Sequence, residues 1–157
     1  MTETNQATPP HLSSEAAARK AWIGLLARAR PDQVAALLPD LPDHVVLRPA
    51  EVGAVMVRGR IGAVGAPFNL GEMSVTRCSV QLADGAVGHG YVQGRDKDHA
   101  RRAAILDALM QTGQGPDVQR DVLDVLAASE AARRQARAEK AAATKVDFFT
   151  LVRGEDK

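Results

Sequence analysis

The residues best placed to do chemistry are arginines around a glycine-rich stretch in the middle of the chain, RGRIGAVGAPFNLGEM at positions 58–73. Such stretches bind phosphate when they precede a helix, and Arg58, Arg60 and the nearby Arg77 would add positive charge. The stretch lacks the lysine and hydroxyl pair of an NTPase phosphate loop, lacks G-x-G-x-x-G, and precedes a strand-like run. We therefore favour a sharp connection between two strands, in which Glu72 pairs with Arg58 or Arg60.

Other groups with catalytic potential are few and scattered. Cys78, the single cysteine, is predicted on the apolar side of a strand, where a thiol is an inert small hydrophobe. The four histidines show no H-x-H or H-x-x-x-H spacing for a metal, and His89 is interpreted as a hydrogen-bonded sheet residue. Asp96 and Asp98 are explained by a helix start, where carboxylates are stabilised. The sequence therefore predicts no catalytic residue and no metal site.

Length and composition indicate one domain without an overall electrostatic field. The chain has 157 residues, with a polar segment 1–12 expected to be a flexible tail and 13–157 expected to form a single domain. Twenty basic and 19 acidic residues give a net charge of +1, so neither a nucleic acid nor a membrane is expected as a partner. Without a signal-peptide pattern or a long apolar run, the chain is predicted to be soluble and cytoplasmic.

Helical periodicity dominates both ends of the chain. An N-terminal helical pair is predicted, the first helix capped by Ser13 or Ser14 and the second opened by Pro31. Near the other end, Asp96 is expected to cap a helix over 97–110. A long helix follows, with Val118, Val122, Val125, Leu126 and Ser129 forming an inward stripe. Beyond Ser129 this helix contains only alanine and polar residues, so it needs a partner or stays solvated.

Between the helical ends, alternation predicts a sheet from Val45 to Gln93. The run SVTRCSVQL places Thr76, Cys78, Val80 and Leu82 on one face, and the Asp-Gly after it predicts an antiparallel hairpin. The segment AEVGAVMVRGR is apolar on both faces and is expected to lie centrally. The predicted fold class is α+β: an antiparallel sheet with helices packed on it, an N-terminal helical pair and a long C-terminal helix.

One predicted strand has an almost bare face. Ala86, Gly88, Gly90 and Val92 point one way along the run AVGHGYVQG. Something must approach this face closely. Either a helix of the same chain or the backbone of another subunit could fill the space.

Three longer strings resemble one known family. They are LRPAEVGAVMVRGRIGAVGAPFNLGEMSVTRCSVQL, then GHGYVQGRDKDHARRAAILDALMQ, then VDFFTLVRGED. Together they resemble the PhnG family, the G subunit of the carbon-phosphorus lyase system of phosphonate degradation. The similarity runs from Trp22 to the C-terminus in the same order.

The resemblance implies a role inside a complex. It implies partnership with the H, I and J subunits, two copies of each, and with the ATPase-like K and L subunits. The I subunit is implied to carry nucleosidase activity, which G, H and L direct to phosphonate. Alkylphosphonate then displaces adenine from ATP at ribose C1. ATP and alkylphosphonate are thus substrates of the assembly, and the iron-sulfur cluster and S-adenosylmethionine belong to the J subunit. This chain itself is expected to bind no cofactor.

Within such a complex, any phosphate binding by Arg58, Arg60 and Arg77 would require a neighbouring chain to complete the pocket. The alanine-rich helix after Ser129 is a further candidate contact. The remaining candidates for subunit contacts are Gly88, Gly90, Arg95, Asp96, Lys97, Phe148, Phe149 and Arg153. Two alternatives stay open: a stand-alone enzyme acting on a phosphorylated nucleoside, with Glu72 and His89 as acid and base, and a small ligand sensor.

Overall fold

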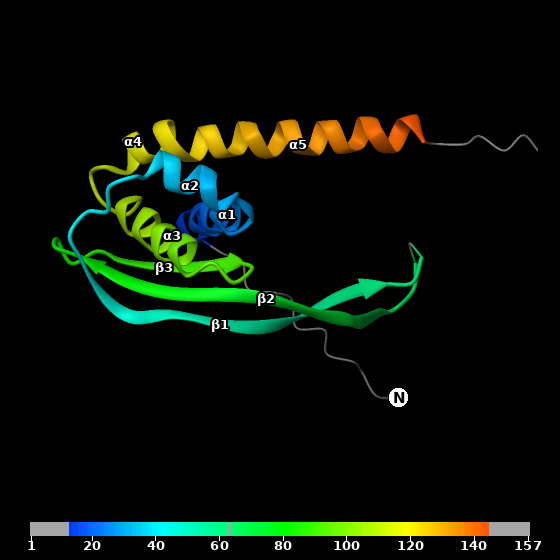
Figure 1. The fold of residues 1–157 in the computed structure, drawn as a ribbon, viewed down its shortest axis with the longest axis horizontal. Coiled ribbons are helices and arrows are strands. Elements are labelled where there is room, and N and C mark those ends of the chain that lie inside the picture. The colour runs from blue at the N-terminus through cyan, green and yellow to red at the C-terminus, as the bar shows by residue number, and fades with distance from the viewer. Residues whose placement is uncertain (1–12, 63, 145–157) are drawn as a thin grey trace, which may run out of the picture.

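Helices cover one face of a small sheet in the computed structural model, which describes residues 13–62 and 64–144 (Figure 1). The predicted α+β class is confirmed, whereas the predicted tail 1–12 and residues 145–157 lie outside the described residues. The elements are α1 (Ser14–Arg28), α2 (Pro31–Leu37), β1 (His44–Arg60), β2 (Pro67–Leu82), β3 (Val87–Gln93), α3 (Lys97–Leu109), α4 (Gly115–Val118), the π-helical turn η1 (Gln119–Leu123) and α5 (Asp124–Ala143).

The sheet has the order β1-β2-β3, and both strand pairs are antiparallel. The predicted inward face of β2 is confirmed, because Thr76, Cys78, Val80 and Leu82 are all buried. The Asp-Gly turn is also confirmed: Gly85 has φ +92, and Asp84 Oδ1 accepts a hydrogen bond from the N–H of Ala86. The prediction that the segment ending at Arg60 lies centrally was wrong. That segment belongs to β1, an edge strand, and β2 is the central strand.

The β1–β2 hairpin extends beyond α1, α2 and α3 as an arm (Figure 1). We define residues 53–73 as the hairpin arm; none of its described residues is buried. The glycine-rich stretch is the outer part of this arm. The connection between Arg60 and Pro67 is the predicted sharp turn, with Gly62 at φ +60, but most of residues 58–73 is strand rather than loop. The apolar residues on both faces of this segment are therefore not buried, and they do not mark a central strand.

Helix α3 fills the bare face of β3. A Cβ added at Gly88 would lie 2.6 Å from the nitrogen of Ala108, and one added at Gly90 would lie 3.1 Å from the nitrogen of Ala104. The same-chain helix is therefore the correct one of the two alternatives. Both glycines are buried against α3, so the bare face gives no reason to place them at a subunit interface.

The N-terminal helical pair packs on the same core. The Ser13 hydroxyl caps α1 by accepting from the N–H of Ala16, as predicted. Pro31 begins α2, and Arg102 of α3 donates to the carbonyl oxygen of Leu38 just after α2 ends. The buried residues shared by these elements and the sheet include Leu26, Val34, Val80, Val92, Ile105 and Leu106.

The C-terminal helices form one rod, α4–η1–α5. Val118, Val122 and Leu126 are buried as predicted, but Val125 is 43% exposed. The π-helical turn explains the difference, because it inserts a residue relative to α-helical spacing and rotates the following side chains. All residues from 131 to 144 are exposed, which confirms that this part of the helix buries little area within the chain.

Substitution of either β3 glycine should weaken the fold itself. Gly88→Ala and Gly90→Ala are each expected to lower the free energy of unfolding by about 1 to 3 kcal/mol, because the new methyl group meets the backbone of α3. Urea denaturation followed by circular dichroism measures the change. Gly53→Ala is the matched control, since no atom lies within 4 Å of its added Cβ. Equal midpoints for all three variants would contradict the close packing.

Candidate functional site

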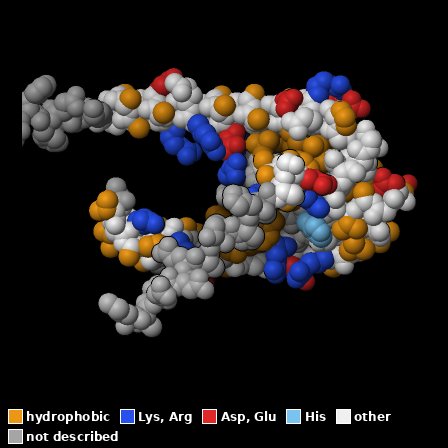
Figure 2. All heavy atoms as spheres, turned by 180° about the vertical axis from the view of Figure 1, so that it is seen from behind, with side chains coloured by type: hydrophobic (Ala, Val, Ile, Leu, Met, Phe, Trp, Pro, Cys, Tyr) orange, Lys and Arg blue, Asp and Glu red, His pale blue; other side chains and the backbone are white. Residues whose placement is uncertain are grey.

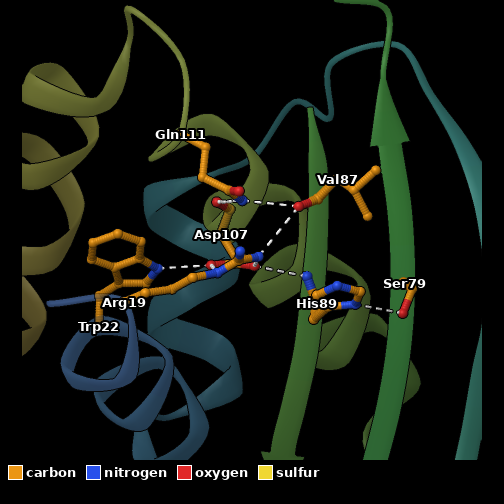
Figure 3. Close-up of polar contacts among 7 residues, drawn as sticks. All are labelled: Arg19, Trp22, Ser79, Val87, His89, Asp107 and Gln111. Carbon is orange, nitrogen blue, oxygen red and sulfur yellow. Dashed lines mark hydrogen bonds and ion pairs between the residues drawn. The ribbon is translucent and has the colours of Figure 1, made fainter. Parts of the chain in front are cut away.

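A polar cluster that joins distant parts of the chain centres on the buried carboxylate of Asp107 (Figure 3). Oδ1 accepts from Arg19 Nε at 3.1 Å and from Trp22 Nε1 at 2.8 Å. Oδ2 accepts from Arg19 Nη2 at 2.7 Å and from the backbone N–H of His89 at 2.9 Å. A buried carboxylate is stable only when it is paired and hydrogen bonded, and these four bonds meet that requirement.

The same cluster also satisfies backbone groups at the start of the outer edge of β3. The Val87 carbonyl oxygen accepts from Arg19 Nη2 at 3.3 Å and from Gln111 Nε2 at 2.9 Å. Unpaired edge groups would otherwise be open to another strand. Because Asp107 comes from α3, Gln111 from the turn just after it and Arg19 from α1, the cluster joins two helices to the strand. Its donors and acceptors are used within the chain, so its role is structural.

Sequence reasoning missed the pairing of Arg19 with Asp107. Two signals were present: Asp107 lies among apolar residues of the 97–110 helix, and Arg19 precedes Trp22 by three residues, on the same side of a helix. Neither signal alone identifies the partner, because the two residues are 88 positions apart.

A buried histidine lies where α3 meets α1. His99 is 2% exposed, and its Nε2 is 3.0 Å from the carbonyl oxygen of Leu26. Its Nδ1 is buried and has no hydrogen-bond partner in the described chain. Burial lowers the pKa of His99, although the Leu26 carbonyl and the nearby Asp96 act in the opposite direction. The ring is therefore neutral at pH 7, with its proton on Nε2.

The structure brings together only two of the three predicted phosphate-binding arginines. Arg58 and Arg60 line a shallow surface depression at the outer end of the hairpin arm. Arg77 lies opposite Glu51 on the inner part of the sheet. Ten residues of β2 separate it from Pro67, the partner of Arg60, which is about 33 Å of extended strand. One phosphate group cannot contact all three within this chain.

The expected ion pair of Glu72 was wrong. Within residues 13–62 and 64–144, no ion pair joins Glu72 to an arginine, and its partner across the strands is Met56. The strand register accounts for this, because Glu72 lies opposite the uncharged Met56, whereas Arg58 lies opposite Asn69 and Arg60 lies opposite Pro67.

The predicted contact residues 95–97 form the turn from β3 into α3. Asp96 caps the helix by accepting from the N–H groups of Asp98 and His99, at 3.0 and 2.9 Å. Arg95 Nε donates to the Ser74 hydroxyl at 3.3 Å, and Lys97 is exposed. A role in the fold thus accounts for Asp96, while contacts of Arg95 and Lys97 with other subunits stay predictions. Phe148, Phe149 and Arg153 lie outside the described residues.

Cys78 and His89 are both engaged within the fold. Cys78 is 3% exposed, its Sγ is 3.5 Å from the Arg48 carbonyl oxygen, and burial raises the pKa of its thiol. His89 is hydrogen bonded to Ser79, with 2.9 Å between Nδ1 and Oγ, as predicted. Across residues 13–62 and 64–144, no three potential metal ligands cluster, and no helix is long and apolar enough to cross a bilayer.

A second polar cluster lies between α1 and α5. Glu130 Oε1 accepts from Arg28 Nε and from Arg134 Nη2, both at 2.9 Å. The hydrogen bond from Arg28 is the main reason that the pKa of Glu130 is lowered. Arg133 and Arg137 line the same hollow, together with Gln93. Four arginines and one glutamate give this surface a net charge of +3.

These features define a class of protein: a scaffold whose buried polar groups hold the fold and whose longest hairpin presents apolar side chains to the outside. The chain belongs to the PhnG family, described as phosphonate metabolism protein PhnG, which it matches over residues 17–154. It is 46% identical over 143 residues to a protein of Rhizobium meliloti (strain 1021), covering 89% of this chain and 92% of that protein. That relative is named alpha-D-ribose 1-methylphosphonate 5-triphosphate synthase subunit PhnG.

Loss of the Asp107 charge should destabilise the chain strongly. Asp107→Asn is expected to lower the free energy of unfolding by about 3 kcal/mol, because Arg19, Trp22 and the His89 N–H lose an ionised acceptor in a buried site. Chemical denaturation measures the effect. Glu51→Gln is the control: its pair with Arg48 is half exposed, so the change should stay within about 0.5 kcal/mol. Similar small effects from both variants would refute the importance of the cluster.

The buried His99 should make stability depend on pH. Its folded pKa lies below the unfolded value of about 6.5, so its contribution is fully present above that value. As the pH falls, the unfolded state takes up a proton that the folded state does not. Stability then decreases by up to about 1.4 kcal/mol per pH unit until the folded pKa is reached. Unfolding curves between pH 7.5 and 5 should show this loss in the wild type and a smaller loss in His99→Gln. If the free energy of unfolding fell equally with pH in both proteins, His99 would not be the cause of the pH dependence.

Proposed function

We propose that this chain is a non-catalytic subunit of alpha-D-ribose 1-methylphosphonate 5-triphosphate synthase and acts in the catabolism of organic phosphonates. The similarity to the R. meliloti subunit supports the identity of the complex. The proposed partners are the H, I and J subunits, two copies of each, with the ATPase-like K and L subunits. The iron-sulfur cluster and S-adenosylmethionine are assigned to the J subunit, and no cofactor is assigned to this chain.

The main support for binding to other subunits is the exposure of apolar side chains on the β1–β2 hairpin. Among the described residues, 11 large hydrophobic side chains are exposed. Nine of them lie on β1, β2 or their connection: Val45, Val46, Leu47, Val52, Met56, Ile61, Val64, Phe68 and Leu70. Exposed apolar side chains concentrated on one hairpin are typical of a protein–protein interface. Exposure of these side chains to water costs free energy, and a partner that covers them removes that cost.

The reaction of the complex requires catalytic groups. Adenine leaves ribose C1 of ATP as a phosphonate oxygen forms a bond to the same carbon. This exchange needs proton transfer to the departing base and cationic groups around the triphosphate. The described side chains of this subunit are engaged in its own fold or lie on open surface. We therefore assign the reacting atoms to the other subunits and the shaping of the assembly to this one.

The stand-alone enzyme is the weaker candidate. It requires Glu72 and His89 to act on one substrate as acid and base. His89 lies opposite Ser79 on β2, and seven residues of strand, about 23 Å, separate Ser79 from Glu72. General acid and base groups must both reach the reacting atoms directly or through one water molecule. This separation does not allow it within one chain.

Reconstitution tests the proposed function. The purified chain alone, incubated with ATP and methylphosphonate, should release adenine no faster than buffer. The set containing the G, H, I and L subunits should form ribose 1-methylphosphonate 5-triphosphate, detected by phosphorus NMR. Omission of this chain should reduce that product to background. Turnover by the isolated chain, or full activity without it, would contradict the proposal.

A further inference from the structure

The hairpin arm and the outer part of α5 project from the same end of the molecule and enclose an open hollow. In Figure 1, α5 runs along one side, the hairpin arm runs along the other, and α1, α2 and α3 lie between them only at the compact end. Figure 2 shows the hollow from behind, with basic side chains on both sides of it. Since residues 131–144 and the described part of 53–73 are unburied, both walls are open to a ligand.

The α5 wall is strongly basic. Arg133, Arg134 and Arg137 line it, next to Arg28 and Glu130 near the compact end. Glu130 engages Arg28 and Arg134. Arg133 and Arg137 are exposed and make no ion pair within the described residues. These two arginines are four positions apart, so they project from the same side of the helix.

The hairpin arm, which forms the opposite wall, carries exposed apolar and basic side chains. Met56, Ile61, Val64 and Leu70 of the hairpin arm are 57%, 77%, 94% and 65% exposed. The ionisable side chains of residues 53–73 are Arg58, Arg60 and Glu72, a net charge of +1. Together with the +3 of the α5 wall, the two walls carry a net charge of +4, although the whole chain carries only +1.

We propose that this hollow clamps one acidic, amphipathic segment of a partner chain, with its apolar side on the hairpin arm and its carboxylates on Arg133 and Arg137. Apolar contact supplies the burial that the arm lacks, and opposite charge fixes the orientation of the segment. This inference rests on the proposed function, because it assumes that the chain acts as a subunit. The inference adds to the proposed function the surface that contacts the partner and the kind of segment that this surface binds.

Other occupants fit the same walls less well. A second copy of this chain would bring its own arginines against these arginines, and like charges oppose association. Residues 145–157 of this chain contain three acidic and three basic side chains, so they offer no net negative charge. A free polyphosphate would satisfy the arginines but would leave Met56, Val64 and Leu70 in water.

Charge reversal in the assembled complex tests the clamp. The chain is co-expressed with the H, I and J subunits, and its affinity for them is measured on the purified components. Arg133→Glu/Arg137→Glu is expected to lower that affinity at least about tenfold. The wild-type affinity should also fall as salt is raised. Leu70→Asp should weaken assembly through the other wall. Arg133→Lys/Arg137→Lys retains the charge and should retain assembly.

Matched controls separate the clamp from the fold. Ala128→Glu/Ala132→Glu places two carboxylates at exposed positions of the same helix that do not line the hollow, and it should assemble like the wild type. Circular dichroism and thermal unfolding of each isolated variant verify that the chain remains folded.

Each remaining outcome has a definite meaning. If the wild-type chain joins the complex and both Arg133→Glu/Arg137→Glu and Leu70→Asp join equally well, the clamp is overturned while the proposed function stands. If the wild-type chain does not join, both fail. If inorganic triphosphate binds the isolated chain through these arginines while assembly is unchanged, the hollow is a small-anion site instead. Dimerisation of the isolated chain that is lost in the charge-reversal variant would identify a second copy as the occupant.

Discussion

The structure depends on one buried charge, the carboxylate of Asp107. A carboxylate removed from water is tolerated only with an opposite charge and enough donors, and here Arg19, Trp22 and a backbone N–H of β3 supply both. Because these donors belong to different elements, satisfaction of one charge fixes the position of α1 and α3 against the sheet. Apolar packing alone would tolerate small rotations of either helix. The four hydrogen bonds to the two Asp107 oxygens tolerate much smaller rotations, because each bond needs a fixed distance and direction.

Close contact between α3 and β3 depends on that fixed geometry. Gly88 and Gly90 allow the helix backbone to approach the strand so closely that no side chain fits between them. At the outer edge of β3, Arg19 and Gln111 bind the Val87 carbonyl oxygen and Asp107 binds the His89 N–H, so these groups are not free to pair with a further strand. The edge strand β1 remains on the opposite side, with exposed apolar residues at both its ends.

The molecule consequently has a packed end and two extensions. The packed end contains the core and the buried polar groups, including His99. The hairpin arm and the outer part of α5 bury almost nothing against the rest of the chain, and their formation relies on strand pairing and on helix propensity. Extensions of this kind are expected in a subunit whose surfaces are completed by other chains. The membership of the PhnG family and the basic, apolar walls of the hollow agree with that view.

The sequence by itself determined the elements and much of the inward face. Ser13, Pro31 and Asp96 mark helix starts because capping and proline geometry are local, and alternation places Thr76 and Cys78 inward because strand periodicity is local. Local patterns failed where the outcome depended on distant residues. They placed β1 centrally because apolar residues on both faces are typical of buried strands as well as of docking surfaces. They could not pair Arg19 with Asp107, separate Arg77 from Arg58, or detect the hollow between the hairpin arm and α5. Those features were decided only by the tertiary structure, because each depends on the distance and direction between elements that the chain joins through long intervening segments.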